Sequence, residues 1–305
     1  MRLSMPGSRP RGWEPLRLAL VALRFLTRLP LPDAWHDGDD LRRAAPWFPL
    51  VGLVVAGVGI GVRAALGPLF GGATATVAAL AAMVALTGAL HEDGLADTAD
   101  GLWGGHDPER RLAIMRDSRI GTYGMVALLT VIGLRVSLLL PLGLAPFARA
   151  VACGQVLGRA SILLLARLLP AATPATPATQ GARIATTHPS GGPPDASLSG
   201  SGRGAPGLST GADLGNGRLG AAMSGPLRRR GALAAALVVG GTALVAAGRW
   251  APVPLAAALA ATLACAGLFR RRLGGLTGDT FGAAALLADL AAVAAVVGLH
   301  RAALL

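Results

Sequence analysis

Three aspartates in one polar stretch have the spacing of a metal-binding site. Asp93, Asp97 and Asp100 lie at positions i, i+4 and i+7, so on an α-helix their carboxylates share one face. Like charges placed so closely repel one another unless a cation lies among them. Hard oxygen ligands suit Mg²⁺ or Mn²⁺, which commonly bridge protein carboxylates and substrate phosphates. A solvated helix end would explain one such aspartate, but three on one face favour the metal.

A basic motif follows further along the chain. Arg116-Asp117-Ser118-Arg119 stands directly before a glycine-containing segment, 121–124. Arginine binds phosphate oxygens through two parallel hydrogen bonds. Arg116, Ser118 and Arg119 are therefore candidates for binding a substrate phosphate.

The segment between these motifs offers weaker candidates. Residues 107–118 have one apolar side, so we expect this segment to lie on a membrane surface. Lipid head groups would then explain Arg110 and Arg111. His91 and His106 are alternative ligands or acid–base groups, although His91 lies off the aspartate face by helical geometry.

A second polar junction, Gly274-Gly275-Leu276-Thr277-Gly278-Asp279, opens the last apolar segment. Glycines before a helix N-terminus, with a hydroxyl and a carboxylate, can hold a phosphate or a metal. This signal is weak alone and gains weight if the junction lies on the same side of the membrane as the aspartates. We therefore nominate Thr277 for substrate binding and Asp279 as a metal ligand.

The composition is that of a membrane protein. Of the 305 residues, 53% are hydrophobic and only 14% are charged, whereas soluble domains have about a quarter. The net charge of +12 comes from arginine alone, mostly in loops between apolar segments. A nucleic-acid partner is excluded, because no basic, aromatic-rich soluble module is present. Cys153 and Cys265 both lie in apolar segments, which argues against a disulfide framework or a zinc site.

The apolar segments predict an all-α polytopic membrane protein with about seven transmembrane helices in a single integral membrane domain. The segments are 46–66, 73–91, 122–141, 146–169, 231–248, 252–269 and 280–299. Residues 16–29 are too short to span and carry a basic stripe, so we expect an N-terminal interfacial helix there. Residues 1–15 are expected to be flexible, and 170–226, rich in Pro, Ala, Thr, Gly and Ser, to form a low-complexity loop.

The distribution of arginine predicts the orientation. With these spans, four loops lie on one side and contain most of the arginines: 33–45, 92–121, 170–230 and 270–279. The positive-inside rule places that side in the cytoplasm. The aspartates, the basic motif and the 274–279 junction would then face the cytoplasm together.

Two charges lie deep in the predicted spans. Arg159 and Asp289 are each at about 15 Å depth by the rise of an α-helix. An unpaired charge at the bilayer centre costs about 2.5–3.5 kcal/mol on insertion scales. We therefore expect Arg159 and Asp289 to form a bridge between their helices.

Five stretches together resemble the cobalamin synthase family, the adenosylcobinamide-GDP ribazoletransferases. They are FLTRLP at 25–30, FPLVG at 48–52, HEDGLADTADG at 91–101, IMRDSRIGT at 114–122 and GGLTGD at 274–279. The resemblance covers nearly the whole chain outside 170–226, and the 91–122 motif is highly specific. The 170–226 insertion departs from the family pattern, with residues 214–216 as a remnant of the family's loop. Asp289 stands where the family usually has a glutamate.

The resemblance implies a membrane-bound transferase that completes the nucleotide loop of adenosylcobalamin. A hydroxyl of α-ribazole, or of its 5′-phosphate, attacks the phosphorus joined to cobinamide, and GMP leaves. The implied partners are the corrinoid-GDP, α-ribazole and membrane lipid, with other cobalamin-assembly enzymes as further candidates. The enzyme would face the cytoplasm from the cell membrane.

The resemblance also implies roles for the residues singled out above. The metal would be Mg²⁺, held by Asp93, Asp97, Asp100 and Asp279. Asp100 or Asp117 would accept the proton of the attacking hydroxyl, and the sequence does not choose between them. Substrate binding would fall to Arg116, Ser118, Arg119, Thr277 and Arg159.

Two alternatives share some of these features. A CDP-alcohol-type phosphotransferase uses the same metal logic but needs an Asp-Gly-x-x-Ala-Arg pattern, whereas here Ala96 is followed by Asp97. A transporter would explain charges within spans, but it predicts acidic residues near the midplane and symmetry between the two halves. The acidic residues instead gather at one predicted interface.

Overall fold

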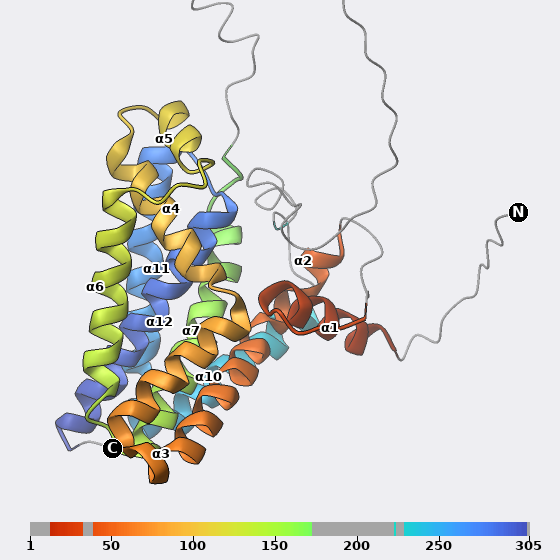
Figure 1. Cartoon of the computed structure of the whole chain (residues 1–305). Coiled ribbons are helices and arrows are strands. Elements are labelled where there is room, and N and C mark those ends of the chain that lie inside the picture. The colour runs from red at the N-terminus through yellow and green to blue at the C-terminus, as the bar shows by residue number, and fades with distance from the viewer. Residues whose placement is uncertain (1–12, 33–38, 173–222, 224–228, 304–305) are drawn as a thin grey trace, which may run out of the picture.

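The computed structural model describes residues 13–32, 39–172, 223 and 229–303, and its regular elements are helices (Figure 1). The long helices are α3 (Phe48–Thr87), α6 (Thr122–Leu139), α7 (Leu144–Leu168), α10 (Arg229–Ala247), α11 (Pro252–Leu273) and α12 (Gly278–Arg301). The shorter elements are α1 (Glu14–Leu26), α2 (Asp40–Ala44), α4 (Leu90–Gly104), α5 (Pro108–Ile114) and the 3-10 turns η2 (Ala45–Trp47) and η4 (Gly248–Trp250). Most of the predicted flexible N-terminus and of the 170–226 loop, including 214–216, lies outside the described residues.

Six helices among the described residues are long and apolar enough to cross a membrane, and one of them supplies two passes. α3 bends at Gly71, whose φ of 81° lies in the region that glycine adopts without a steric penalty. The two arms of α3 run side by side (Figure 1), with Gly59 of the first arm packed directly on Met83 of the second. The predicted segments 46–66 and 73–91 thus correspond to the arms of one bent helix, in agreement with about seven passes. The predicted end at residue 91 was too late, because α3 ends at Thr87 and α4 begins at Leu90.

α12 is the central helix of the bundle. It packs on α7, α4 and α11. Gly158 of α7 lets the two backbones meet, since a Cβ there would lie 2.5 Å from the carbonyl oxygen of Ala285 in α12. Small residues drive helix association in membranes, because lipid tails are as apolar as the side chains they would replace. This close packing fixes where the N-terminus of α12 lies.

Three of the polar loops predicted for one side of the membrane lie together at one end of the bundle, the end of α4 and α5 in Figure 1: 92–121, the start of 170–230, and 270–279. The side chain of Arg111 in α5 donates to the carbonyl oxygen of Arg272, at the end of α11, at 2.9 Å. The backbone N–H of Leu276 donates to the carbonyl oxygen of Pro170 at 2.9 Å, and that of Ala172 to Leu276 at 2.8 Å. The segment after α7 therefore pairs with the 274–279 junction, and the predicted shared end is confirmed.

Arg63, in the first arm of α3, closes the opposite end. Its guanidinium donates to the carbonyl oxygens of Gly72 and Leu142 and to the hydroxyl of Thr76. It also lies 4.8 Å from the ring centroid of Phe147. These contacts join the bend in α3 to the turn between α6 and α7. This buried charge was not predicted from the sequence.

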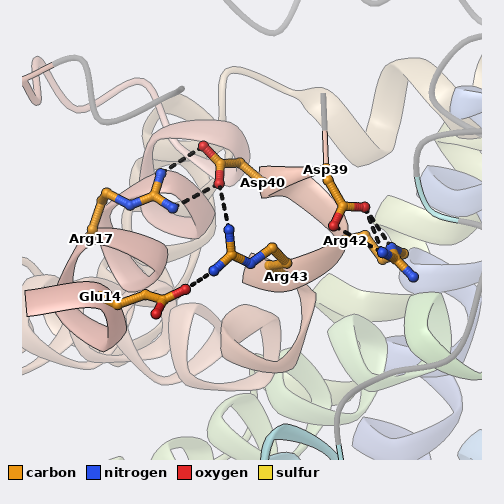
Figure 2. Close-up of polar contacts among 6 residues, drawn as sticks. All are labelled: Glu14, Arg17, Asp39, Asp40, Arg42 and Arg43. Atoms are coloured by element: carbon orange, nitrogen blue, oxygen red, sulfur yellow. Dashed lines mark hydrogen bonds and ion pairs between the residues drawn. The ribbon is translucent and has the colours of Figure 1, made fainter. Parts of the chain in front are cut away.

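The predicted interfacial helix is α1, which at 13 residues is too short to span a bilayer. It lies at the side of the bundle, beside α2 (Figure 1). Its basic stripe was expected to face the membrane surface, but Arg17 donates two hydrogen bonds, at 2.6 and 2.8 Å, to the fully buried Asp40 (Figure 2). A buried carboxylate requires such a partner. The expectation was therefore wrong for Arg17, which ties α1 to α2.

Candidate active site

α4 holds the three predicted aspartates on one side but in three different environments. Asp93 is exposed, Asp97 is half-buried, and Asp100 is only 7% exposed. Among the described residues, no three acidic, histidine or cysteine side chains converge closely enough to hold a metal ion. The three aspartates therefore do not form a complete ligand cage by themselves.

Asp100 is engaged in the fold. Its carboxylate accepts hydrogen bonds from the backbone N–H groups of Gly121 at 2.7 Å and Gly124 at 2.9 Å, at the start of α6. These N–H groups have no partner within the helix, and the positive end of the helix favours a negative charge. Asp100 thereby anchors the α5–α6 loop to α4, and it is the least available of the three carboxylates for a ligand.

The carboxylate of Asp97 is repelled by its two neighbouring carboxylates, as the spacing predicted. The pKa of Asp97 is raised to about 6. Burial is the largest cause, and the nearby carboxylates of Asp93 and Asp100 add to it. A divalent cation at this face would oppose each of these effects. Mg²⁺ is often bound by one or two carboxylates and completes its coordination with water and substrate phosphate. Asp93 and Asp97 therefore fit Mg²⁺ as a pair, without a third aspartate from α4.

The N-terminus of α12 meets the same part of α4. A Cβ at Gly94 would lie 2.7 Å from the carbonyl oxygen of Asp279, so the two helices are in backbone contact there. The Thr277 hydroxyl accepts from the backbone N–H of Thr280 at 3.3 Å and caps the helix. The structure thus brings Asp279 and the positive end of α12 to the aspartates. The hydroxyl of Thr277 is buried and used by the cap.

The basic motif lies on the loop between α5 and α6, where Arg116, Ser118 and Arg119 are exposed. Asp117 accepts from the Arg119 side chain at 2.6 and 3.0 Å. These side-chain hydrogen bonds, together with one from the Arg119 backbone, lower the pKa of Asp117 to about 2. A carboxylate with so low a pKa is a weak base, so the geometry does not favour Asp117 as the proton acceptor.

Arg111 was expected to meet lipid head groups, and that expectation was wrong. The side chain is 6% exposed and donates to two carbonyl oxygens of the α4–α5 turn, each at 3.0 Å, and to Arg272. Leu112 and Met115, from the side predicted to face the membrane, are buried as well. α5 therefore clamps α4 to the end of α11.

A polar chamber lies inside the bundle, behind α4. Asp289 of α12 forms an ion pair with Arg135 of α6 at 3.2 Å and accepts from the amide of Gln155 of α7 at 3.1 Å. Arg159 instead donates to the side-chain and backbone oxygens of Gln155, at 2.8 and 3.1 Å. The predicted Arg159–Asp289 bridge was therefore wrong: Gln155 stands between the two, and Arg135 supplies the opposite charge.

His91 and Glu92 line this chamber from α4, around a cavity of about 20 Å³. A cavity holds one water when its volume exceeds about 10–15 Å³ and polar partners surround it. Five buried atoms here have no hydrogen-bond partner: His91 Nε2, Glu92 Oε2, Arg135 Nε, Arg159 Nε and Asp289 Oδ2, the last of which Arg135 meets in the ion pair. The roles of Arg135 and Gln155 were not predicted from the sequence. A charge inside an apolar segment was the signal available for Arg135.

The comparisons with known proteins point to one family. The chain matches the family described as cobalamin-5-phosphate synthase over residues 18–193 and 205–297. Proteins named adenosylcobinamide-GDP ribazoletransferase are similar to it: that of Brucella anthropi is 42% identical over 164 residues, that of Xanthobacter autotrophicus 51% over 129, and that of Shewanella amazonensis 45% over 144. The matches cover 50%, 39% and 47% of this chain and 62%, 48% and 55% of those relatives. The chain thus spans between 48% and 62% of the length of these relatives. No solved structure matches it.

Proposed function

The chain belongs to the cobalamin-5-phosphate synthase family, and we propose that it is an adenosylcobinamide-GDP ribazoletransferase. In this reaction a sugar hydroxyl of α-ribazole, or of its 5′-phosphate, attacks the phosphorus attached to cobinamide. A new P–O bond forms, the bridging P–O bond of the pyrophosphate breaks, and GMP leaves. The product is adenosylcobalamin or its 5′-phosphate, and the hydroxyl proton passes to a base.

One observation carries the assignment of the site: the aspartate side of α4, the N-terminus of α12 and the exposed arginines of the α5–α6 loop share one end of the bundle. Phosphoryl transfer needs positioning and charge stabilisation more than covalent chemistry. Arg116 and Arg119 can bind phosphate oxygens, and the positive end of α12 favours their negative charge. Mg²⁺ bound by the pair Asp93 and Asp97, with Asp279 nearby, would neutralise the pyrophosphate and the departing GMP.

Neither of the two carboxylates nominated as proton acceptors is well suited to accept a proton. Asp100 already accepts two backbone hydrogen bonds, and the pKa of Asp117 is lowered to about 2. We therefore assign Asp100 to holding the α5–α6 loop and Asp117 to orienting Arg119. Ser118, on the same exposed loop, remains a proposed substrate contact, as do Thr277, through the helix it caps, and Arg159 from the chamber.

We further propose that this end of the bundle faces the cytoplasm from the cell membrane, because its loops carry most of the arginines. The corrinoid-GDP and α-ribazole would bind there, at the surface of the lipid. Other enzymes of cobalamin assembly are the proposed protein partners. The family membership favours this transferase over a CDP-alcohol-type phosphotransferase or a transporter.

The direct test is turnover by the purified protein in lipid vesicles with adenosylcobinamide-GDP, α-ribazole and Mg²⁺, measured as GMP release. We expect GMP release from the unaltered protein and at least a hundredfold loss in Asp93→Asn and Asp97→Asn. Glu109→Gln is the matched control, because Glu109 is an exposed acid at the same end, on α5. That variant should keep full activity.

Binding of Mn²⁺, measured by electron paramagnetic resonance, distinguishes a loss of metal binding from a loss of catalytic activity. Asp97→Asn should weaken Mn²⁺ binding, whereas Glu109→Gln should not. Absence of GMP release from the unaltered protein would refute the assigned activity. Full activity and unchanged Mn²⁺ binding in both aspartate variants would refute the assigned site.

A further inference from the structure

A pocket of about 670 Å³ lies where the N-terminal helices meet α10, away from the residues assigned to the reaction. Its walls come from α1, α2, η2, the start of α3 and the first turns of α10. Its volume falls in the range of roughly 300–1,000 Å³ that small-molecule sites occupy. The pocket is therefore large enough for an organic ligand, not only for water.

One part of the pocket lining is charged. Arg42 donates to Asp39 at 2.8 and 2.9 Å, and Arg43 pairs with Glu14 and lies 3.7 Å from Asp40 (Figure 2). These acidic partners hold both guanidinium groups in place along the wall. The Nε of Arg43 is buried and has no hydrogen-bond partner.

Arg230, at the start of α10, adds a charge to this wall that the other charges do not balance. It lines the pocket, is exposed, and makes no ion pair or hydrogen bond with the part of the chain that the structure describes. The paired arginines and acids nearly cancel one another, so Arg230 leaves the charged part with a net positive charge. The pocket is therefore suited to an anionic group.

Another part of the lining is apolar and consists of Leu18, Trp47, Leu50, Ala234 and Val238. Leu50 lies at the start of α3, and Ala234 and Val238 lie on the first turns of α10. α3 and α10 are both helices long and apolar enough to cross a membrane, and both begin at this pocket. The pocket therefore lies at the level where the membrane surface meets the hydrocarbon.

We propose that this pocket binds an anionic phospholipid. The phosphate meets Arg230, together with Arg42 and Arg43, and an acyl chain lies along the apolar wall between α3 and α10. A free phosphate compound would leave that wall in water, and a zwitterionic lipid would compensate Arg230 less completely. Arginine at the membrane surface attracts anionic lipid, and its planar guanidinium can hold a phosphate through two hydrogen bonds.

The test is direct measurement of bound lipid on the full-length protein. The protein is purified in detergent, stripped of lipid, and titrated with phosphatidylglycerol or phosphatidylcholine, and the bound lipid is counted by native mass spectrometry. We expect one tightly bound phosphatidylglycerol and much weaker binding of phosphatidylcholine. A basic residue at a membrane surface strengthens the binding of anionic lipid. Arg230→Gln should therefore weaken phosphatidylglycerol binding about fivefold. Arg229→Gln removes the same charge from the neighbouring residue, which does not line the pocket, and should change binding less than twofold.

A second pair of variants tests the apolar wall. Ala234→Trp fills the pocket and should abolish the tight phosphatidylglycerol site, whereas Ala236→Trp, an exposed position on the same helix outside the lining, should retain it. Equal losses in Arg229→Gln and Arg230→Gln would overturn the proposal, because diffuse surface charge would then explain the binding. Tight binding that survives Ala234→Trp would place the lipid elsewhere. Displacement of the lipid by one equivalent of adenosylcobinamide-GDP would assign the pocket to the substrate instead.

Discussion

Removal of the Arg135 charge should destabilise the protein, because Asp289 in the polar chamber would lose its ion-pair partner. In the ion pair, the side chains of Arg135 and Asp289 are 9% and 3% exposed, so neither charge has much access to water. Arg135→Met keeps most of the side-chain length but leaves Asp289 with the amide of Gln155 alone. Breaking one partner of a buried ion pair typically costs about 3–5 kcal/mol. A lone charge at the centre of a membrane helix costs about 2.5–3.5 kcal/mol. We therefore expect Arg135→Met to destabilise the protein by about 3 kcal/mol.

A double-mutant cycle makes this expectation specific to the pair. Asp289→Leu removes the charge that Arg135→Met leaves unpaired, so the double variant should recover most of the lost stability. The coupling energy between Arg135 and Asp289 should be about 2–3 kcal/mol, within the range seen for residues in contact. Arg159→Met removes donors to the uncharged oxygens of Gln155 and not to Asp289 itself, so it should couple to Asp289 more weakly, by about 0.5–1 kcal/mol through the shared Gln155.

The assay is equilibrium unfolding in mixed micelles with increasing dodecyl sulfate, followed by circular dichroism, for the two cycles in parallel. Both cycles use the same Asp289→Leu variant, so any difference between the two coupling energies comes from the arginines. A coupling to Arg159 as large as the coupling to Arg135 would refute the placement of the ion pair. So would an Arg135→Met protein as stable as the unaltered one.

Three further predictions concern the aspartate side of α4. The pKa of Asp97 is about 6 in the folded protein, above its ordinary value of 3.8, so ionisation of this group removes stability as the pH rises through about 6. Added Mg²⁺ should therefore raise the melting temperature more at about pH 7.5 than at about pH 5. An equal rise at both pH values would contradict this. Asp100→Ala removes the cap on α6 and should cost about 2 kcal/mol in chemical unfolding with or without Mg²⁺, whereas Asp93→Ala, at an exposed position, should change stability by less than about 0.5 kcal/mol when Mg²⁺ is absent. Gly94→Ala forces a Cβ against the backbone of α12 and should cost about 1–3 kcal/mol, while Gly57→Ala, where a Cβ would meet nothing within 4 Å, serves as its control and should be nearly neutral.

The sequence by itself determined the class of the protein and the region of its chemistry. The lengths of the apolar segments are a local property, and they predicted the helices that cross the membrane and the break near Gly71. The spacing of Asp93, Asp97 and Asp100 placed their carboxylates on one side of a helix, which the structure confirms for α4. The count of spans between charged loops also put the polar junctions at one end, because each pass reverses the direction of the chain.

Only the tertiary structure decided which polar groups meet. A helix that is apolar all round carries no amphipathic signal to say which side packs on protein and which faces lipid. The rotation of α6 about its axis was therefore not predictable from the sequence, and neither was the choice of Arg135 over Arg159 as the partner of Asp289. The use of Asp100 as a cap likewise depends on how the α5–α6 loop returns to α4, which spacing along one helix does not specify.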